Sequence, residues 1–375
     1  MSERIFPSNP TMRAMAAGVQ AGVPVLLWGK PGAGKSATIE GNFAKWGYHI
    51  ETITASSRES VDFLGMPKET DNGVEYVPFK WAQRAAAAKK AVVFFDELTT
   101  GGISAERGML RVIQEGWVGE LKLPDTVRFI AAANPPDVAV GGEELAPPTA
   151  NRFMHLDWHF DADHWRTGMV AGFDNVAVPS LESMTAGGSV EDRAHAFALV
   201  VAFTQHRPDL LEPAVPTGEA AGRAYPTPRA WTNVARVLTF VHRDDTSTQL
   251  LVLSGLVGNG AAREFITWVA SAGLYDVVAV MNDPSIVTWT KDRPDTLYAL
   301  LQAVVSTAIG HGDKATYEKA FAVCESAAVA GRKDVMIPAL MELGSRKPSD
   351  AAIPASLHPA LSDVLIAPRV ALRSA

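Results

Sequence analysis

The eight-residue run Gly29–Ser36, which reads Gly-Lys-Pro-Gly-Ala-Gly-Lys-Ser, limits the possible folds of this chain more than any other stretch. An apolar run at 23–28 precedes it and is expected to form a buried strand, while 36–40 is expected to open a helix. A strand, a glycine-rich loop and a helix in this order direct backbone N–H groups and the positive end of the helix dipole at one point. The pattern G-x-x-x-x-G-K-[S/T] therefore predicts a site for the phosphates of a nucleoside triphosphate.

The loop residues have separate expected roles. Lys35 would reach the β and γ phosphates, and the Ser36 hydroxyl would ligate Mg²⁺. A glycine-rich turn without a ligand is the alternative interpretation. The residues expected to contact ATP are Gly29, Pro31, Gly32, Ala33, Gly34, Lys35, Ser36 and Ala37.

Two acidic residues follow a second apolar run. The stretch 91–95 is continuous in apolar residues, as in a parallel strand that is buried on both faces, and Asp96 and Glu97 come directly after it. Ligands bind at this carboxyl edge of open α/β sheets. Asp96 is expected to hold Mg²⁺ through its water shell, and Glu97 to polarise the attacking water as general base. Paired acids after a strand also serve as helix caps, but behind a phosphate-binding loop the catalytic interpretation is favoured.

Two further polar residues stand next to predicted strands. Asn134 ends the apolar run 127–133 and is followed by two prolines, so its amide is expected to sense the γ-phosphate. Arg152 precedes the alternating stretch 154–160, which predicts a strand with one polar face. Arg152 is thus expected to be held rigidly, either as a guanidinium offered to a neighbouring nucleotide or as part of a surface salt bridge.

This ordered series of motifs resembles the core of AAA+ ATPases and is most similar to the MoxR-type branch. The stretches Leu110–Gly116 and Pro226–Ala230 are similar to that family's helix-plus-hairpin and lid motifs, so the resemblance covers about the first 270 residues. It implies an α/β P-loop NTPase (AAA+) fold, in which a parallel sheet is flanked by helices and followed by an α-helical lid domain and a helical C-terminal tail. The domain limits it suggests are 1–170 for the ATPase core, 171–275 for the lid, and 276–375 for a helical extension with a Pro-rich end.

The resemblance also assigns roles to three residues. Asn134 corresponds to sensor 1, Arg152 to the arginine finger that acts in trans, and Arg229 to the sensor 2 that reports nucleotide to the lid. Asn151 stands where many relatives carry Asp. The arginines Arg107 and Arg111 are therefore alternative residues that could face a neighbouring subunit.

Two hairpins are predicted between the main strands. The first has arms at 66–70 and 74–79 around Asp71-Asn72-Gly73, because Asn-Gly favours the positive φ angles of a tight turn. It resembles the helix-2 insert of MoxR-type ATPases, whose loops face the pore of a ring. The second hairpin spans 116–124. Residues expected either to touch a client or to pack on their own subunit are Met66, Tyr76, Phe79 and Trp117.

The rest of the chain is predicted to be mainly helical. Apolar residues recur at helical spacing in 190–205, 231–242, 249–256, 261–270, 293–309, 314–329 and 334–343. No catalytic motif is recognised in the last hundred residues.

Composition excludes several classes of protein. None of the apolar runs in the 375 residues approaches the roughly 20 needed to cross a bilayer, which predicts a soluble, cytoplasmic protein without membrane insertion. The 34 basic and 41 acidic residues give a net charge of −7, which lacks the basic excess of a general nucleic-acid binder, although a local basic channel would still be compatible with it. The single cysteine, Cys324, excludes an internal disulfide and a cysteine-based zinc site.

A group of alternating histidines and aspartates is the other candidate metal site. On a strand, however, His155 and His159 would lie roughly 13 Å apart, too far to share one ion. The alternation argues against the helix that would bring them together. The remaining members of this group are Asp157, Asp161, Asp163 and His164.

The resemblance implies a homo-oligomeric ring, expected to be a hexamer, that couples Mg²⁺-dependent ATP hydrolysis to remodelling, assembly or activation of a protein partner. MoxR-type ATPases often work with proteins that carry von Willebrand factor A domains, so such a protein is the first expected client or adaptor. One alternative is a nucleic-acid motor similar to the McrB-type restriction GTPases. Another is a slow nucleotide-dependent structural switch, which the presence of Glu97 disfavours because a pure binder needs no general base.

Overall fold

The computed structural model describes residues 9–71, 73–135, 144–217, 221–273 and 275–360. These form two compact units: the first comprises the described residues up to 186 and those within 213–262, and the second comprises 187–212 and the described residues from 263 on. The predicted turn residue Asn72 and the end of the chain after residue 360 lie outside the described residues. The domain limits predicted from the sequence, at 170 and 275, stay predictions.

A five-stranded parallel sheet lies at the centre of the first unit. The strands are β1 (Val25–Trp28), β2 (His49–Thr54), β5 (Ala91–Asp96), β8 (Val127–Ala133) and β9 (Met154–Asp157). Their order in the sheet is β2-β5-β8-β1-β9, and every neighbouring pair is parallel. The predicted α/β fold with a parallel sheet is therefore confirmed. The apolar side chains of β1 and of Ala91–Phe95 in β5 are buried, as expected for strands with both faces covered.

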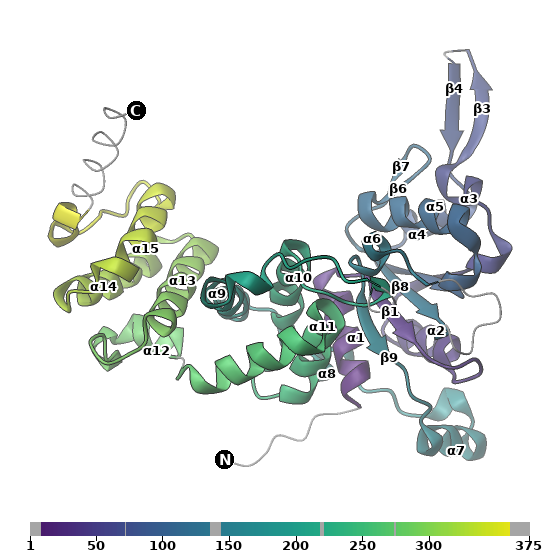
Figure 1. Ribbon diagram of the computed structural model, residues 1–375. Coiled ribbons are helices and arrows are strands. Elements are labelled where there is room, and N and C mark those ends of the chain that lie inside the picture. The colour runs from purple at the N-terminus through teal and green to yellow at the C-terminus, as the bar shows by residue number, and fades with distance from the viewer. Residues whose placement is uncertain (1–8, 72, 136–143, 218–220, 274, 361–375) are drawn as a thin grey trace. The chain divides into compact units, whose positions relative to one another are not determined.

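Helices cover both faces of this sheet (Figure 1). The helices α1 (Pro10–Ala21) and α2 (Lys35–Lys45) pack on one face, and α4 (Lys80–Ala87) and α5 (Gly102–Glu115) pack on the other. Alternate strand residues such as Leu26 and Val93 enter one apolar cluster with Trp81 of α4 and Met109 of α5. Because successive side chains of a strand point to opposite faces, the same strands supply both cores.

A buried ion pair joins the N-terminal helix to the start of α11 (Thr246–Ser271). The Arg13 Nε atom donates to Oδ2 of Asp245 at 2.7 Å, and both side chains are at most 5% exposed. Burial by itself raises the pKa of Asp245, but hydrogen bonds from Arg13, Thr248 and Ser247 bring the pKa below its usual value. Each buried charge thus depends on its partner, so α1 and the first turns of α11 are held together.

Both predicted hairpins are present. The strands β3 (Met66–Thr70) and β4 (Gly73–Val77) pair antiparallel, as do β6 (Trp117–Val118) and β7 (Leu121–Lys122). The longer hairpin extends away from the sheet (Figure 1). The two meet at the base, where Glu120 N–H donates to the Tyr76 carbonyl at 3.1 Å and Gly119 lies so close to this carbonyl that a Cβ would not fit.

Short helices complete the first unit. They are α3 (Val61–Leu64), α6 (Pro147–Ala150), α7 (Ala162–Ala171), α8 (Leu181–Met184) and α10 (Pro228–Leu238), together with the first part of α11. Gly258, with φ of 79°, interrupts the helical backbone of α11. The predicted helices at 249–256 and 261–270 lie on the two sides of this residue.

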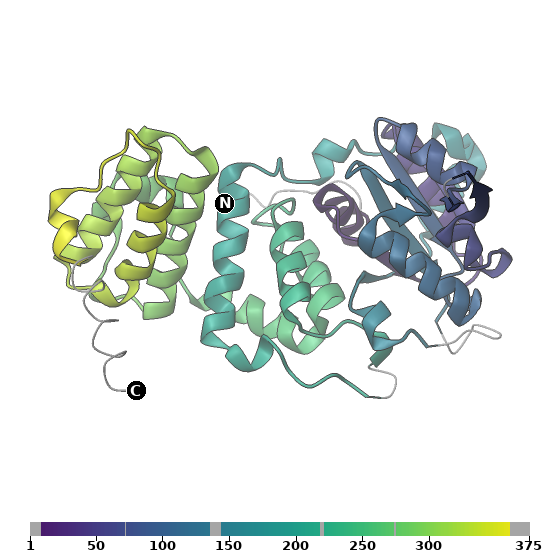
Figure 2. The ribbon, with the colours of Figure 1, turned by 90° about the horizontal axis from the view of Figure 1, so that it is seen from above.

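The second unit is helical, as predicted, and Figure 2 shows its later helices in yellow-green beside one another. Among the described residues, its α-helices are the last part of α11, α9 (Val190–His206), α12 (Val277–Asn282), α13 (Pro294–His311), α14 (Lys314–Val329) and α15 (Lys333–Arg346). The core includes Leu297, Phe321 and Leu340. Cys324 is also part of this core, where burial raises the pKa of its thiol to about 12. None of the helices among the described residues is long and apolar enough to cross a membrane.

One strand prediction is wrong in its extent. β9 ends at Asp157, not at Phe160, because Asp161 caps the next helix by accepting from the N–H groups of Asp163 and His164. His155 is buried and does not lie on a solvent-facing polar side. The physical reason is that its imidazole stacks on the Trp28 ring and is hydrogen-bonded to Trp28 and to the Ala150 carbonyl. Gly255 of α11 also lies so close to the His155 carbonyl that a Cβ would not fit.

The burial of His155 predicts a pH-dependent stability of the first unit. Burial lowers the pKa of His155 from 6.5 to about 4, so between these values the unfolded chain binds a proton that the folded chain does not. Stability should therefore be full at pH 7 and fall by about 2 kcal/mol between pH 7 and pH 5 from this residue alone. Urea unfolding at both pH values measures this difference.

The matched control is His155→Gln, which cannot titrate in this range. It should lose most of the stability difference between pH 7 and pH 5, whereas an equal pH slope in both proteins would contradict the assignment to His155.

Candidate active site

Three neighbouring strands bring their carboxyl ends to one edge of the sheet. The phosphate-binding loop begins at Gly29 directly after β1, Asp96 ends β5, and Asn134 follows β8, which lies between these two strands. A cavity of about 320 Å³ opens there. Its lining consists of Pro31, Gly32, Ala33, Gly34, Lys35, Ser36, Ala37, Asp96, Glu97, Ala132, Ala133 and Asn134. The residues predicted to bind phosphate and metal are thus gathered around one space.

The Lys35 ammonium group lies folded into this loop. Its Nζ atom donates to the carbonyl oxygens of Gly29 at 2.5 Å and Lys30 at 3.1 Å, and to Oδ1 of Asn134 at 3.1 Å. Burial lowers the pKa of Lys35, whereas the charge of Asp96 opposes this change. These contacts join the loop to the end of β8, so Lys35 and Asn134 can meet the same phosphate.

Ser36 and Asp96 form an oxygen-only pair at the opposite side of the loop. The Ser36 hydroxyl donates to Oδ2 of Asp96 at 2.5 Å, and Oδ1 of Asp96 accepts from the Glu97 N–H at 2.9 Å. A hydroxyl and a carboxylate are hard oxygen donors, which Mg²⁺ prefers, and the pair leaves room in the cavity for the water molecules this ion retains. The residues present therefore fit the predicted metal.

Glu97 adopts a strained backbone conformation. Among the described residues other than glycine, it is the only one with a positive φ, at 57°. The left-handed region costs an ordinary residue roughly 1–2 kcal/mol. Its carboxylate Oε2 accepts from the Ser56 hydroxyl at 2.6 Å. The backbone and Ser56 together orient this carboxylate at the cavity wall.

Sequence reasoning missed Ser56. It follows β2, the strand that pairs with β5 in a register that sets Thr54 opposite Asp96. The signal available in the sequence was a polar residue just beyond the end of β2, the strand next to β5, which ends in Asp96.

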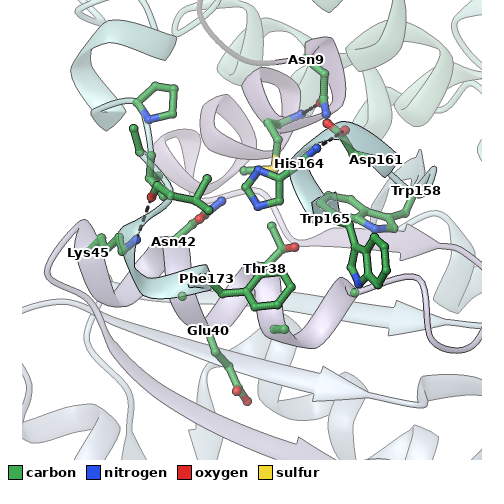
Figure 3. A pocket seen from close by; sticks show the side chains of 18 of the residues that line it. Asn9, Thr38, Glu40, Asn42, Lys45, Trp158, Asp161, His164, Trp165 and Phe173 are labelled. Atoms are coloured by element: carbon green, nitrogen blue, oxygen red, sulfur yellow. Dashed lines mark hydrogen bonds between the residues drawn. The ribbon is translucent and has the colours of Figure 1, made fainter. Parts of the chain in front are cut away.

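A second and larger cavity adjoins the phosphate cavity. It measures about 680 Å³ and shares Ala33, Gly34 and Ala37 with the smaller one. Its aromatic lining comprises Trp46, Trp158, Phe160, Trp165 and Phe173. Figure 3 shows His164, Trp165 and Phe173 around the cavity with Thr38 of α2. A space of this size and aromatic character is suited to a nucleoside whose phosphates lie on the loop.

The segment over this cavity is tied to α2. The Lys45 ammonium donates to the carbonyls of Asp174 and Val176 at 3.0 and 3.1 Å, and the Trp46 indole donates to the Pro179 carbonyl at 2.9 Å. These contacts keep the segment after α7 beside the C-terminal end of the helix that starts at the loop.

Trp158 supports the loop and was also missed from the sequence, which predicted it only as one face of a strand. Its indole N–H donates to the Ala33 carbonyl at 3.0 Å. Its backbone lies so close to Gly29 that a Cβ at this position would contact the Trp158 carbonyl at 2.9 Å. Close approach, and not a positive φ, is the reason why glycine is needed at residue 29.

Arg152 and Arg229 do not line either cavity. They lie near one another, since burial and then the positive charge of Arg229 lower the pKa of Arg152. Asn151 joins the two segments, because it donates to the Tyr225 carbonyl at 3.1 Å and accepts from the Thr227 hydroxyl at 2.9 Å. Among the described residues, the buried Nε atom of Arg152 has no hydrogen-bond partner, whereas another nitrogen of its guanidinium contacts the Pro148 carbonyl.

The alternating histidines and aspartates do not form a metal cluster. His155 is buried in hydrogen bonds with Trp28 and Ala150, while His164 lies in α7. In the described ranges, no group of three or more His, Cys, Asp or Glu side chains is placed to hold a metal ion.

Comparison with known families agrees with this geometry. Residues 25–141 match the family described as "ATPase family associated with various cellular activities (AAA)". This segment is therefore similar to an AAA ATPase domain. It begins with β1 and contains the loop, the Asp96–Glu97 pair and Asn134.

Two individual proteins resemble parts of the chain. Midasin of Giardia intestinalis is 28% identical over 144 residues, which cover 36% of this chain and 3% of midasin. A crystal structure from Cytophaga hutchinsonii, of a protein whose assignment as an ATPase is provisional, aligns with a TM-score of 0.38 and 15% identity. That alignment covers 65% of this chain and 80% of the other.

The contact between Ser56 and Glu97 predicts a selective loss of turnover in Ser56→Ala. A hydrogen bond to a charged group contributes about 1.5–3 kcal/mol, and loss of the lower amount from the orientation of Glu97, the predicted general base, corresponds to roughly a tenfold lower kcat. The KM for ATP should stay unchanged because Ser56 does not line the phosphate cavity.

Steady-state ATP hydrolysis measures both constants. Ser57→Ala is the matched control, because the Ser57 hydroxyl donates to the Thr54 carbonyl and not to Glu97. Equal kcat values in the two variants would contradict an orienting role for Ser56.

Proposed function

We propose that this chain hydrolyses ATP with Mg²⁺ in a ring of identical subunits and uses this hydrolysis to remodel, assemble or activate a protein partner. The observation that carries the proposal is the contact of 2.5 Å between the Ser36 hydroxyl and the Asp96 carboxylate beside Glu97. It brings the metal-binding groups of the loop and of β5 to one point next to a candidate general base.

Binding of the triphosphate would engage the residues of the smaller cavity. Backbone N–H groups of Gly32–Ser36 and the positive end of α2 would receive the phosphates. Lys35 would exchange its carbonyl partners for phosphate oxygens, and Asn134 would stay within reach of the same group. The aromatic cavity would then hold the nucleoside.

Hydrolysis would depend on Glu97, with Ser36 and Asp96 holding Mg²⁺. The ion, when bound, supplies positive charge that stabilises the phosphate oxygens. Glu97 would accept a proton from the attacking water, since its carboxylate lines the cavity and is fixed by Ser56. Asn134 would orient the γ-phosphate.

The arginines support a shared site between two copies of the chain. Arg152 and Arg229 lie outside the phosphate cavity of their own chain, and Arg229 is exposed. Two arginines whose positive charges act on one another favour an anion from outside the chain. We therefore assign Arg152 to a neighbour's nucleotide. The position of Arg229 beside Arg152 favours action on the same phosphate over a role at its own cavity.

The hairpins provide a surface for a protein partner. The longer hairpin exposes Met66, Val74 and Tyr76, of which 53%, 60% and 48% respectively are accessible to solvent. Trp117 of the shorter hairpin is 38% exposed. Exposed apolar side chains on both hairpins favour a macromolecular contact over a purely structural role.

The proposed function predicts that ATP turnover per subunit rises with protein concentration, because each site needs two copies. Arg152→Ala should bind ATP normally but lower turnover about a thousandfold. Steady-state hydrolysis over a range of concentrations measures this, with Glu97→Gln as the blank and Arg128→Ala as the matched arginine control. GTP and added DNA are parallel conditions.

Mixing Arg152→Ala with Lys35→Ala subunits should restore part of the activity, because some interfaces then pair an intact pocket with an intact arginine. The absence of rescue at every ratio would overturn the shared site. Preference for GTP or stimulation by DNA would instead favour a nucleic-acid motor. Turnover independent of concentration, in a protein that is monomeric by sizing, would exclude the ring.

A further inference from the structure

A chain of hydrogen bonds runs through the first unit between the phosphate-binding loop and the segment of Arg152. The Trp28 indole N–H donates to Nδ1 of His155 at 2.9 Å, and Nε2 of His155 donates to the Ala150 carbonyl at 2.8 Å. Trp28 is the residue before Gly29, and Ala150 is two residues before Arg152. His155 therefore contacts both parts of the proposed shared site.

The imidazole is fixed in one neutral form. Because Nδ1 accepts a hydrogen bond, the single proton lies on Nε2 and both ring nitrogens have a partner. The Trp28 and His155 rings are stacked with an interplanar angle of 17°. The backbone of His155 is held in turn by β1 on one side and by Gly255 of α11 on the other. The ring thus has little freedom to move.

The hydrogen bond from His155 to the Ala150 carbonyl restrains a short turn. α6 has only four residues, and its last carbonyl, that of Ala150, accepts from the Phe153 N–H at 3.2 Å as well as from His155. The turn from Ala150 to Phe153 carries Asn151 and Arg152. A helix of four residues has too few internal hydrogen bonds to set the direction of Arg152 alone. An outside donor at its last carbonyl supplies this restraint.

We propose that His155 is a positioning residue that sets the Arg152 guanidinium for the nucleotide of a neighbouring copy. This inference rests on the proposed function, in which Arg152 acts in trans. His155 does not touch the nucleotide and acts only through the Ala150 carbonyl. The opposite possibility is that His155 acts through Trp28 on the loop of its own chain.

Two substitutions separate the effect of the hydrogen bond between Trp28 and His155 from that of the bond between His155 and Ala150. His155→Asn keeps an acceptor at the place of Nδ1 for Trp28 but is too short to donate to Ala150. Trp28→Phe removes the indole donor and leaves the bond from His155 to Ala150. His155→Asn should lower kcat for ATP at least tenfold with KM unchanged, whereas any defect of Trp28→Phe should lie in its own pocket and raise KM.

Mixed subunits decide through which end His155 acts. If His155 positions Arg152, His155→Asn subunits have an intact phosphate cavity but a misplaced Arg152. Lys35→Ala subunits, which bring intact arginines, should then rescue them, and Arg152→Ala subunits should not. The reverse pattern, rescue by Arg152→Ala alone, would overturn the proposal in favour of the loop, as would wild-type turnover of His155→Asn or equal rescue by both.

Two controls keep the result interpretable. Thermal melting and ATP binding establish that His155→Asn is folded. If it is not, His155→Gln replaces it: this longer amide can accept from Trp28 and donate to Ala150, so it should be active. A defect of this variant that Arg152→Ala subunits rescue and Lys35→Ala subunits do not would overturn the proposal. If Lys35→Ala and Arg152→Ala subunits do not restore activity when mixed with each other, the proposed function itself is refuted. This outcome differs from those that would refute only the role of His155.

Discussion

The parallel register of β1, β8 and β5 is the constraint on which the rest of the site depends. Parallel strands end at the same edge, so three segments distant in sequence deliver the loop, Asn134 and Asp96 to one cavity. The contacts from Lys35 to Asn134 and from Ser36 to Asp96 exist only because of this alignment. Even the strain at Glu97 follows from it, because the chain must turn sharply where β5 ends.

Much of this arrangement could be predicted from sequence because it follows local rules. The motif at 29–36 specifies a strand, a loop and a helix, and the apolar runs before Asp96 and Asn134 are those of buried parallel strands. The parallel sheet, both hairpins and the helical region that follows the sheet in the sequence were therefore predictable. The roles of Glu97, Asn134 and Arg152 stay predictions, although the first two residues lie where the chemistry needs them.

The remainder depends on tertiary packing, which a single sequence does not reveal. The alternation at 154–160 predicted a solvent-facing side for His155, but the Trp28 ring stacks on its imidazole, and Gly255 of α11, a hundred residues later, lies against its backbone. Ser56 and Trp158 carry no motif, and their value comes from contacts with Glu97 and Ala33. The proximity of Arg229 to Arg152 likewise depends on hydrogen bonds of Asn151 to a segment more than seventy residues away.

The buried pair of Arg13 and Asp245 has a consequence for how this ATPase core should be delimited. The segment similar to the AAA family, 25–141, contains neither residue. A fragment cut at these limits would lack α1 and β9 as well, and would open part of one face and one edge of the sheet to water. The part of the chain that carries the recognisable motifs is therefore smaller than the part that must fold together. The buried ion pair that holds this larger part together comes from two residues outside any motif.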